Sequence, residues 1–171
     1  MSDEQPGIPL LRRREIEAGV LGPVIRAFAQ EIGDERALQV VRKVVAELAR
    51  KGGADLAQAI GQASLTAFAG TLDRWREGGA LEIDMLEQSE TSLSFNVTRC
   101  RYAEMYRALG MEELGSSLSC SRDLHLARGF NPEIELVRTQ TIMEGAPFCD
   151  FRFRKPDQAR EPEAGQGPDQ E

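Results

Sequence analysis

The sequence contains few of the residues that build metal sites or disulfide frameworks, with three cysteines and one histidine among 171 residues. No apolar run approaches the roughly 20 residues that a membrane-spanning helix needs. The polar N-terminus, SDEQPG, is followed by LLRRREIE, which is too charged for the core of a signal peptide. An odd number of cysteines without a secretion signal favours free thiols. We therefore expect a cytoplasmic protein with no membrane partner.

A basic excess is also absent, because the formal net charge is −7. Nucleic-acid-binding proteins usually carry a basic footprint, so we expect no nucleic-acid partner. The sequence contains no phosphate-binding loop, no dinucleotide fingerprint and no Gly-x-Ser-x-Gly elbow. No common nucleotide-binding or nucleophile-elbow motif therefore indicates a function for this sequence.

The first half of the sequence is typical of helices. Apolar residues recur at helix spacing over about 14–33, and Pro23 should kink or interrupt this helix. A second helix is predicted to end at the pair Gly52-Gly53, and a third, rich in Ala and Gly, to cover about 55–75. The small residues of the third helix should allow close packing, and they could also serve as a self-association face for a homo-oligomer.

The second half begins with the two-residue period of β-strands. Alternating apolar residues predict a hairpin from strands at about 81–85 and 93–97. The remaining predicted elements are helices over 102–109 and 112–127 and strands over 134–143 and 148–153.

This order of elements predicts an α+β fold, in which an N-terminal helical layer packs on a small antiparallel sheet built from two hairpins. The chain is long enough for one domain with a sizeable core. We place that domain at residues 13–154, between a flexible arm over 1–12 and a disordered tail over 155–171. The tail shows no apolar periodicity.

All three cysteines lie between Asn96 and Phe153, together with the only histidine, and each has ionisable neighbours. Cys100 is predicted at the junction of a strand and a helix, where the helix dipole and the flanking arginines would lower its pKa. Glu104 follows one helical turn later, so its carboxylate can reach back toward that thiol. The alternative is a small buried thiol beside a capping acid.

Cys120 and Asp123 are three residues apart on a predicted helix and therefore lie on the same helical face. His125 is five residues from Cys120, about 140° around the helix, so it is poorly placed to act on that thiol. Cys149 shares a strand face with two phenylalanines and should point toward the core, or toward a pocket that the core lines. For Cys120 and Cys149 the alternative is an inert, packed thiol.

The cysteine spacing matches no common zinc site, since the sequence has no Cys-x-x-Cys pair. We therefore predict no metal and no other cofactor. A zinc site of three thiolates, with or without His125, is the alternative that a fold could still assemble.

Three blocks of sequence carry a resemblance to a known family. They read N-V-T-R-C-x-Y-A-E-x-Y-x-x-L-G at 96–110, C-x-x-D at 120–123 with G-F-N-P at 129–132, and R-T-Q-T-I-M-E-G-x-x-x-C-D-F-R-F at 138–153. Together they resemble the L-2-amino-thiazoline-4-carboxylic acid hydrolase family, over about Ile16 to Arg154 and most specifically in the second half. The resemblance implies hydrolytic opening of a five-membered cyclic isothiourea to an N-carbamoyl cysteine, or more broadly a small-ring hydrolase.

Ring opening of this kind requires attack on an electrophilic C=N or C=O carbon and protonation of the leaving atom. We predict Cys120 as the nucleophile. The other predicted catalytic residues are Asp123 and Glu104 as acid/base groups and Cys100 and Cys149 as reserve nucleophiles. An arginine fork is a natural receptor for a substrate carboxylate. The predicted substrate-binding residues are Arg138, Arg99, His125 and Asn96.

Two other functions remain open from the sequence. A non-catalytic small-molecule binding or sensor domain could share the fold, as vinyl-reductase-type ligand-binding domains have a comparable design. A zinc-dependent hydrolase of cyclic amides would use the cysteines as metal ligands. The expected partner of the hydrolase is a small heterocyclic substrate.

Overall fold

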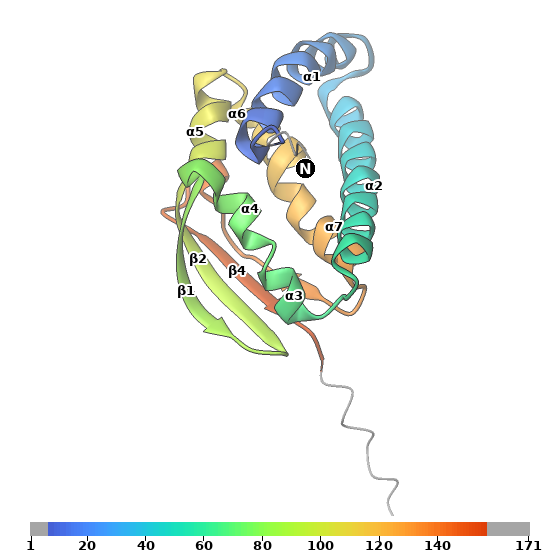
Figure 1. Cartoon of the computed structure of the whole chain (residues 1–171). Helices are drawn as coiled ribbons and strands as arrows, with labels where there is room; N and C mark the ends of the chain where they lie inside the picture. The colour runs from blue at the N-terminus through green and yellow to red at the C-terminus, as the bar shows by residue number, and fades with distance from the viewer. Residues whose placement is uncertain (1–6, 157–171) are drawn as a thin grey trace, which may run out of the picture.

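In the computed structural model, which describes residues 7–156, helices cover one face of a four-stranded antiparallel sheet (Figure 1). The long helices α1 (Leu10–Ile32) and α2 (Asp34–Ile60) are joined by Gly33, whose φ of 88° lies in the left-handed region that favours glycine. The chain then passes to the sheet through three short elements, α3 (Leu65–Ala69), α4 (Leu72–Arg76) and the 3-10 turn η1 (Glu77–Gly79).

Pro23 lies inside α1, and the helix is not interrupted there. Proline removes the hydrogen bond that a backbone N–H would donate to the carbonyl of Gly19. Gly19 is exposed, so water can replace that donor. The hydrogen bonds of the other turns of α1 are therefore sufficient to keep the helix continuous at Pro23.

α2 continues through the Gly52-Gly53 pair, so the predicted helix end at these glycines is wrong. Gly53 is buried where α2 crosses α7 (Ser121–Phe130). A Cβ atom at Gly53 would overlap the Leu126 carbonyl oxygen and lie 2.6 Å from the Phe130 amide nitrogen. The glycine therefore permits the close approach of two helices rather than ending one of them.

The helix predicted over 55–75 is divided in the structure. Its first part belongs to α2, and the rest forms α3 and α4. α2 ends before Gly61, whose φ of 78° lies in the left-handed region. Ser64 starts α3, because its hydroxyl accepts a hydrogen bond from a backbone amide of the first turn. Several of the small residues pack against the core, which is the close packing that the sequence favoured. They are Ala57, Ala63 and Ala67.

The sheet consists of two hairpins. Their strands are β1 (Leu81–Gln88), β2 (Ser92–Cys100), β3 (Glu135–Val137) and β4 (Cys149–Arg154). The strand order is β1-β2-β4-β3, so the hairpins join through antiparallel pairing of β2 with β4. The predicted α+β fold, with an N-terminal helical layer on a small antiparallel sheet, is confirmed. β3 is shorter than predicted, because the chain leaves the sheet after Val137 and forms the 3-10 turn η3 (Ile142–Glu144).

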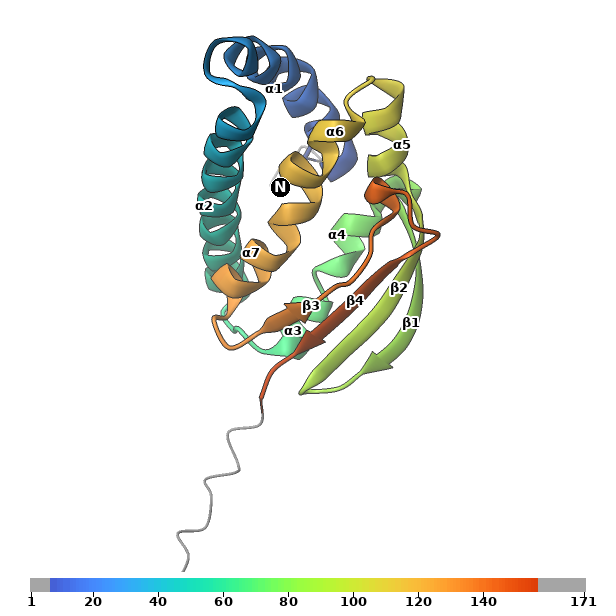
Figure 2. The ribbon, with the colours of Figure 1, turned by 180° about the vertical axis from the view of Figure 1, so that it is seen from behind.

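The chain between β2 and β3 is helical. Its elements are α5 (Arg101–Ala108), α6 (Glu112–Gly115), η2 (Ser116–Cys120) and α7. η2 is a π-helical turn, so the single regular helix predicted over 112–127 is wrong in its centre. Turns of this kind are frequent at functional sites. Figure 2 shows α7 between α2 and the hairpin of β3 and β4.

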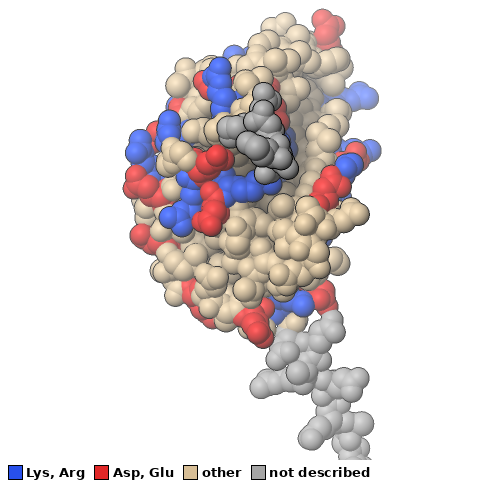
Figure 3. All heavy atoms as spheres, viewed as in Figure 1, with Lys and Arg blue, Asp and Glu red and all other residues tan. Residues whose placement is uncertain are grey.

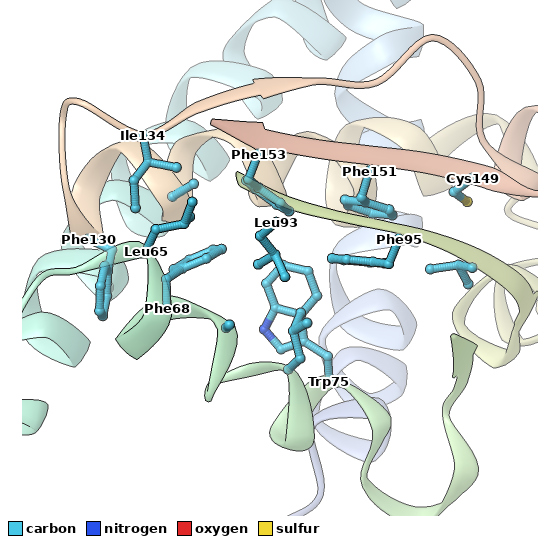
Figure 4. Close-up of a cluster of buried hydrophobic side chains, with 14 residues drawn as sticks. Leu65, Phe68, Trp75, Leu93, Phe95, Phe130, Ile134, Cys149, Phe151 and Phe153 are labelled. Carbon is cyan, nitrogen blue, oxygen red and sulfur yellow. The ribbon is translucent and has the colours of Figure 1, made fainter. Parts of the chain in front are cut away.

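Alternate residues of β2 and β4 point toward the helices and form the centre of the core (Figure 4). The Phe95 ring stacks on Phe151 with centroids 4.9 Å apart, and Phe153 meets Phe68 edge-on at 5.1 Å. The prediction that Cys149 shares a buried face with the two phenylalanines of its strand is confirmed. A second apolar cluster joins α1, α2, α5 and α6, so the described residues form one cluster under the sheet and one among the helices.

Parts of the predicted arm and tail, residues 1–6 and 157–171, lie outside the described residues. α1 begins at Leu10, inside the predicted arm, because Leu10 and Leu11 pack against the two apolar clusters and extend the helix. None of the helices within 7–156 combines the length and the apolar character that a bilayer crossing requires.

Candidate active site

A cavity of about 290 Å³ lies between the sheet and the helical layer. All three cysteines line it: Cys100 at the end of β2, Cys120 at the end of η2 and Cys149 at the start of β4. Asp123 of α7 and Arg138, which follows β3, also belong to its wall. The structure therefore brings these five predicted residues together from five segments of the chain.

Cys100 is the N-cap of α5, and its sulfur accepts a hydrogen bond from the Ala103 amide at 3.4 Å. Its position at a strand–helix junction is as predicted, but the predicted lowering of its pKa is wrong. Burial raises the pKa of the Cys100 thiol to about 11, and hydrogen bonds from backbone amides oppose this only in part. An apolar environment solvates a thiolate poorly, so Cys100 is a neutral thiol at neutral pH.

Cys120 ends the π-helical turn, and Asp123 follows one turn later in α7, so both side chains reach the cavity. Burial, and then the Asp123 carboxylate, raise the pKa of the Cys120 thiol far above its ordinary value. Burial also raises the pKa of Asp123, against the opposing effect of Arg138. The pair is therefore a neutral thiol beside a carboxyl group that binds a proton more tightly than an ordinary aspartate does.

Arg138 holds Asp123 in place. Its guanidinium donates to Asp123 Oδ2 at 2.6 Å and to the Cys120 carbonyl oxygen at 3.0 Å. It also lies 4.9 Å from the centroid of the Phe151 ring, a cation–π distance. The side chains of Arg138 and Asp123 are 15% and 23% exposed, so the ion pair is largely shielded from water. The sequence predicts Arg138 as a receptor for a substrate carboxylate, but Asp123 already engages it.

Cys149 is buried, and its sulfur accepts a hydrogen bond from the Ile142 amide at 3.2 Å. Burial raises the pKa of the Cys149 thiol, while this hydrogen bond and then Arg138 act in the opposite direction. All three cysteines are free, as predicted. Within the described part of the chain, no three His, Cys, Asp or Glu side chains are grouped closely enough to hold a metal ion.

The cavity wall also contains arginines that the sequence interpretation missed. They are Arg13, Arg14, Arg74 and Arg122. Among the described residues, Asp123 is the only carboxylate in the same wall. The run of arginines at 12–14 was visible in the sequence, but nothing local to it indicated that α1 packs beside the cysteines. The wall therefore carries a positive excess within a chain of net charge −7.

Arg14 and Arg122 form a half-buried pair in this wall. Each side chain is 16% exposed, and both approach the same Glu17 carboxylate oxygen, at 2.5 Å from Arg14 and 3.6 Å from Arg122. Arg122 also donates to the Leu118 carbonyl oxygen at 2.8 Å. Burial, and then the nearby Arg14, lower the pKa of Arg122. Among residues 7–156, these two guanidinium groups thus share one acid, Glu17, which leaves an excess of one positive charge in the pair.

Glu104 and Arg99 lie outside the cavity wall. Glu104 is exposed on α5 and forms an ion pair with Arg99 at 2.8 Å, and Arg99 also approaches Glu82 at 3.5 Å. Hydrogen bonding to Arg99 lowers the pKa of Glu104. The carboxylate does not turn back toward Cys100, because Arg99 holds it at the surface. The structure therefore does not bring Glu104 or Arg99 to the thiols.

Asn96 and His125 are also outside the wall. Asn96 belongs to the alternate face of β2, where its side-chain oxygen accepts a hydrogen bond from Arg152 at 2.9 Å. His125 is half-buried on α7, and its Nδ1 has no hydrogen-bond partner among the described residues. Burial, and then Arg50, lower the pKa of His125. The structure brings neither residue to the cavity.

A helical layer on a two-hairpin sheet, with a cavity between them lined by thiols and arginines, defines a class of α+β domains with an interior site. The chain belongs to the L-2-amino-thiazoline-4-carboxylic acid hydrolase family, whose pattern matches residues 13–153. The resemblance noted in the sequence is thereby confirmed. A search of curated proteins found no match.

Two solved structures share this fold. A trafficking protein particle complex subunit 3 from Naegleria fowleri, covalently bound to palmitic acid, has a TM-score of 0.53 and 12% identity, over 87% of this chain and 98% of that chain. The phenol-responsive sensory domain of the transcription activator PoxR, with phenol, has a TM-score of 0.51 and 14% identity, over 89% and 78%. At these identities the similarity establishes the fold alone.

Proposed function

We propose that this protein is a hydrolase that opens a small, carboxylate-bearing heterocycle such as a cyclic isothiourea, imide or lactam. Family membership supports ring hydrolysis, since the family is named for a hydrolase of a thiazoline carboxylate. The observation that carries the proposal is that three thiols and Asp123 share the wall of one cavity. The nucleophile must reach the substrate carbon while the proton carrier reaches the nucleophile and the leaving atom, and a shared wall supports this.

The size and charge of the cavity support a small anionic substrate. Its volume of about 290 Å³ is near the lower end of the roughly 300–1,000 Å³ of small-molecule sites. Arg14 and Arg122 are the best candidates to bind a substrate carboxylate, because in the described part of the chain they share a single ion-pair partner, Glu17. In this role they replace Arg138, which is engaged by Asp123.

In the proposed reaction on a cyclic isothiourea, Cys120 Sγ bonds to the amidine carbon while its proton passes to Asp123. The bond from that carbon to the ring sulfur breaks, and the ring sulfur leaves as a thiol after taking the proton from Asp123. Water then attacks the carbon held by Cys120 and gives a proton to Asp123. The carbamoyl product leaves, and Asp123 returns the proton to Cys120 Sγ. The sum is the addition of one water molecule across the ring bond.

The raised pKa values agree with this order of events. The Cys120 thiol stays protonated before substrate binds, so its proton must leave during the attack. The raised pKa of Asp123 makes its carboxylate a stronger base than an ordinary aspartate, and Arg138 keeps it oriented. Cys100 and Cys149 remain the reserve nucleophiles of the same wall.

A ring-opening assay with mass-spectrometric detection of products tests the proposal. Wild type and the variants Cys120→Ser, Cys100→Ser and Cys149→Ser are each incubated with 2-amino-thiazoline-4-carboxylate and with cyclic isothioureas, hydantoins, imides and lactams. We expect wild type to open at least one ring and Cys120→Ser to lose at least about 100-fold in rate. Full activity of Cys120→Ser would eliminate this nucleophile. No ring opening by wild type across the panel would reject the hydrolase.

A ligand-binding domain without catalysis is the second candidate. It is favoured by the three protonated thiols and by the two solved structures of this fold, which are described with a bound phenol and a covalent palmitic acid. Fold alone does not decide between these functions. Titration calorimetry with the same panel, phenol and palmitate discriminates them, since tight binding without product would favour the second candidate.

A further inference from the structure

The central part of α1 has an apolar surface that no described residue covers. Residues 18–29 read AGVLGPVIRAFA and contain one charged residue, Arg26. One side of this segment packs into the fold, whereas Val20, Val24 and Phe28 are 64%, 45% and 58% exposed. A helix segment that is apolar almost all round is normally buried on more than one side.

The single charge of this segment points away from the exposed apolar residues. Arg26 pairs with Glu113 of α6 at 2.7 Å and also donates to the Gly110 carbonyl oxygen. Val20, Val24 and Phe28 recur every four residues, so they form one continuous ridge along the helix. No charged side chain of residues 18–29 therefore interrupts the ridge.

α2 carries a second ridge of the same kind. Val40, Val44 and Leu48 also recur every four residues, and they are 55%, 48% and 55% exposed. Figure 3 shows uncharged side chains over much of α1 and the neighbouring edge of α2, with a hollow between the two helices. We refer to these two ridges, Val20, Val24 and Phe28 with Val40, Val44 and Leu48, as the α1/α2 face.

The size of the α1/α2 face matches that of a stable protein interface. Six large apolar side chains at about half exposure, with three more beside them on α1, present an area on the order of the 800 Å² that each partner contributes to such an interface. The three neighbours are Ile16, Leu21 and Ile32. Exposed apolar patches of this size mark interaction sites.

The two segments outside the described residues have almost no large apolar residues with which to cover this face. The sequences at 1–6 and 157–171, MSDEQP and DQAREPEAGQGPDQE, contain one large apolar residue, Met1. These two segments therefore offer little apolar surface for the α1/α2 face.

We propose that the α1/α2 face is the interface of a two-fold symmetric dimer of this chain. A two-fold contact brings the same face of both copies together, and ridges with a four-residue period can pack between ridges of the same kind. Copies of a chain with net charge −7 repel each other, but the six side chains that define this face are themselves uncharged. Leu48 also lines the cavity, so the second copy would border the site.

Sedimentation velocity on the full chain over a wide concentration range tests the dimer. Wild type is expected at twice the chain mass. Val24→Glu on α1 and Val44→Glu on α2 should each shift it to the mass of one chain, because the interface would bury an unpaired charge. Both positions are about half exposed in the single chain, so the fold should tolerate them, and circular dichroism checks this. The control is Leu86→Glu, which introduces the same charge at a 57% exposed apolar residue of β1.

Three results would overturn the proposal. They are a wild type with the mass of one chain at every concentration, a dimer that persists in both Glu variants, and a dimer lost equally in Leu86→Glu. Wild type is also incubated with vesicles of phosphatidylcholine and phosphatidylglycerol. Co-sedimentation of single chains with the vesicles, lost in Val24→Glu, would assign the face to a lipid surface and so also overturn the dimer.

Discussion

Cys100 occupies the N-cap of α5, a position where a helix dipole favours the thiolate. Its sulfur is nevertheless protonated, because burial raises its pKa to about 11. A helix terminus contributes about 0.3–1 kcal/mol to a nearby charge, whereas removing a charge from water costs several kcal/mol. The same desolvation raises the pKa values of Cys120 and Cys149. At the scale of single residues, burial controls whether the thiols of this cavity are protonated.

Replacing Cys100 by serine should change how stability depends on alkaline pH. The folded-state pKa of Cys100, about 11, exceeds the value of about 8.5 in an unfolded chain. The protonated Cys100 thiol therefore contributes its full stabilisation below about pH 8.5, and this stabilisation is lost as the pH rises toward 11. By about pH 11 wild type should have lost about 3 kcal/mol more free energy of unfolding than Cys100→Ser.

Urea unfolding at neutral pH and near pH 11 measures this difference. Serine keeps an N-cap acceptor for the Ala103 amide, so the helix itself should remain. Parallel loss of stability in the two proteins would show that burial of this thiol does not control its ionisation.

At the scale of elements, the crossing of α2 and α7 sets one side of the cavity. The two backbones meet at glycines on both helices, and a Cβ atom at Gly129 would overlap the Arg50 carbonyl oxygen as one at Gly53 would overlap α7. α7 carries Asp123 and α2 carries Ala49, and both line the cavity. The close crossing therefore brings the acid of one helix toward the apolar wall of the other.

Gly53→Ala should destabilise the protein by about 3 kcal/mol, because the methyl group must displace backbone atoms rather than a flexible side chain. Gly52→Ala is the matched control. Its nearest atom would be Leu126 Cδ1 at 3.9 Å, so the added helix propensity should stabilise the protein by about 0.5–1 kcal/mol. Urea denaturation of both variants measures the contrast, and changes of the same sign would contradict the role of Gly53.

At the scale of the whole molecule, the cavity lies between the helical layer and the sheet, and each layer supplies part of its wall. The three thiols come from β2, η2 and β4, and all three have raised pKa values. Their reactivity is therefore a property of the assembled layers rather than of any one segment. Unfolding should therefore make all three thiols reactive together.

We expect the native protein to react with a disulfide reagent such as DTNB at least about 10-fold more slowly per thiol than glutathione does at neutral pH, because little thiolate is present. The rate should rise as the pH approaches 11, where Cys100 ionises. In concentrated urea all three thiols should react at the rate of the glutathione control. One thiol that reacts as fast as glutathione in the native protein at neutral pH would contradict the raised pKa values.

The apolar periods of the sequence predicted the fold class, because the faces that a helix or strand buries are recorded in its own residues. The three blocks of sequence that resemble the family contain the three cysteines, Asp123 and Arg138, and the structure brings these residues together at one cavity. Gly52-Gly53 was misread, since a glycine that ends a helix and one that admits a neighbouring helix look alike in sequence. Only the partner helix distinguishes them.

The sequence by itself therefore determined the layers, the free thiols and five residues of the candidate site, namely the three cysteines, Asp123 and Arg138. Tertiary structure alone decided that Glu104 pairs with Arg99 at the surface, that Arg138 engages Asp123, and that Arg14 faces the cavity. It also decided that the thiols are protonated. Ion pairing and desolvation depend on which groups distant segments bring within a few ångströms, and local patterns carry no record of those neighbours.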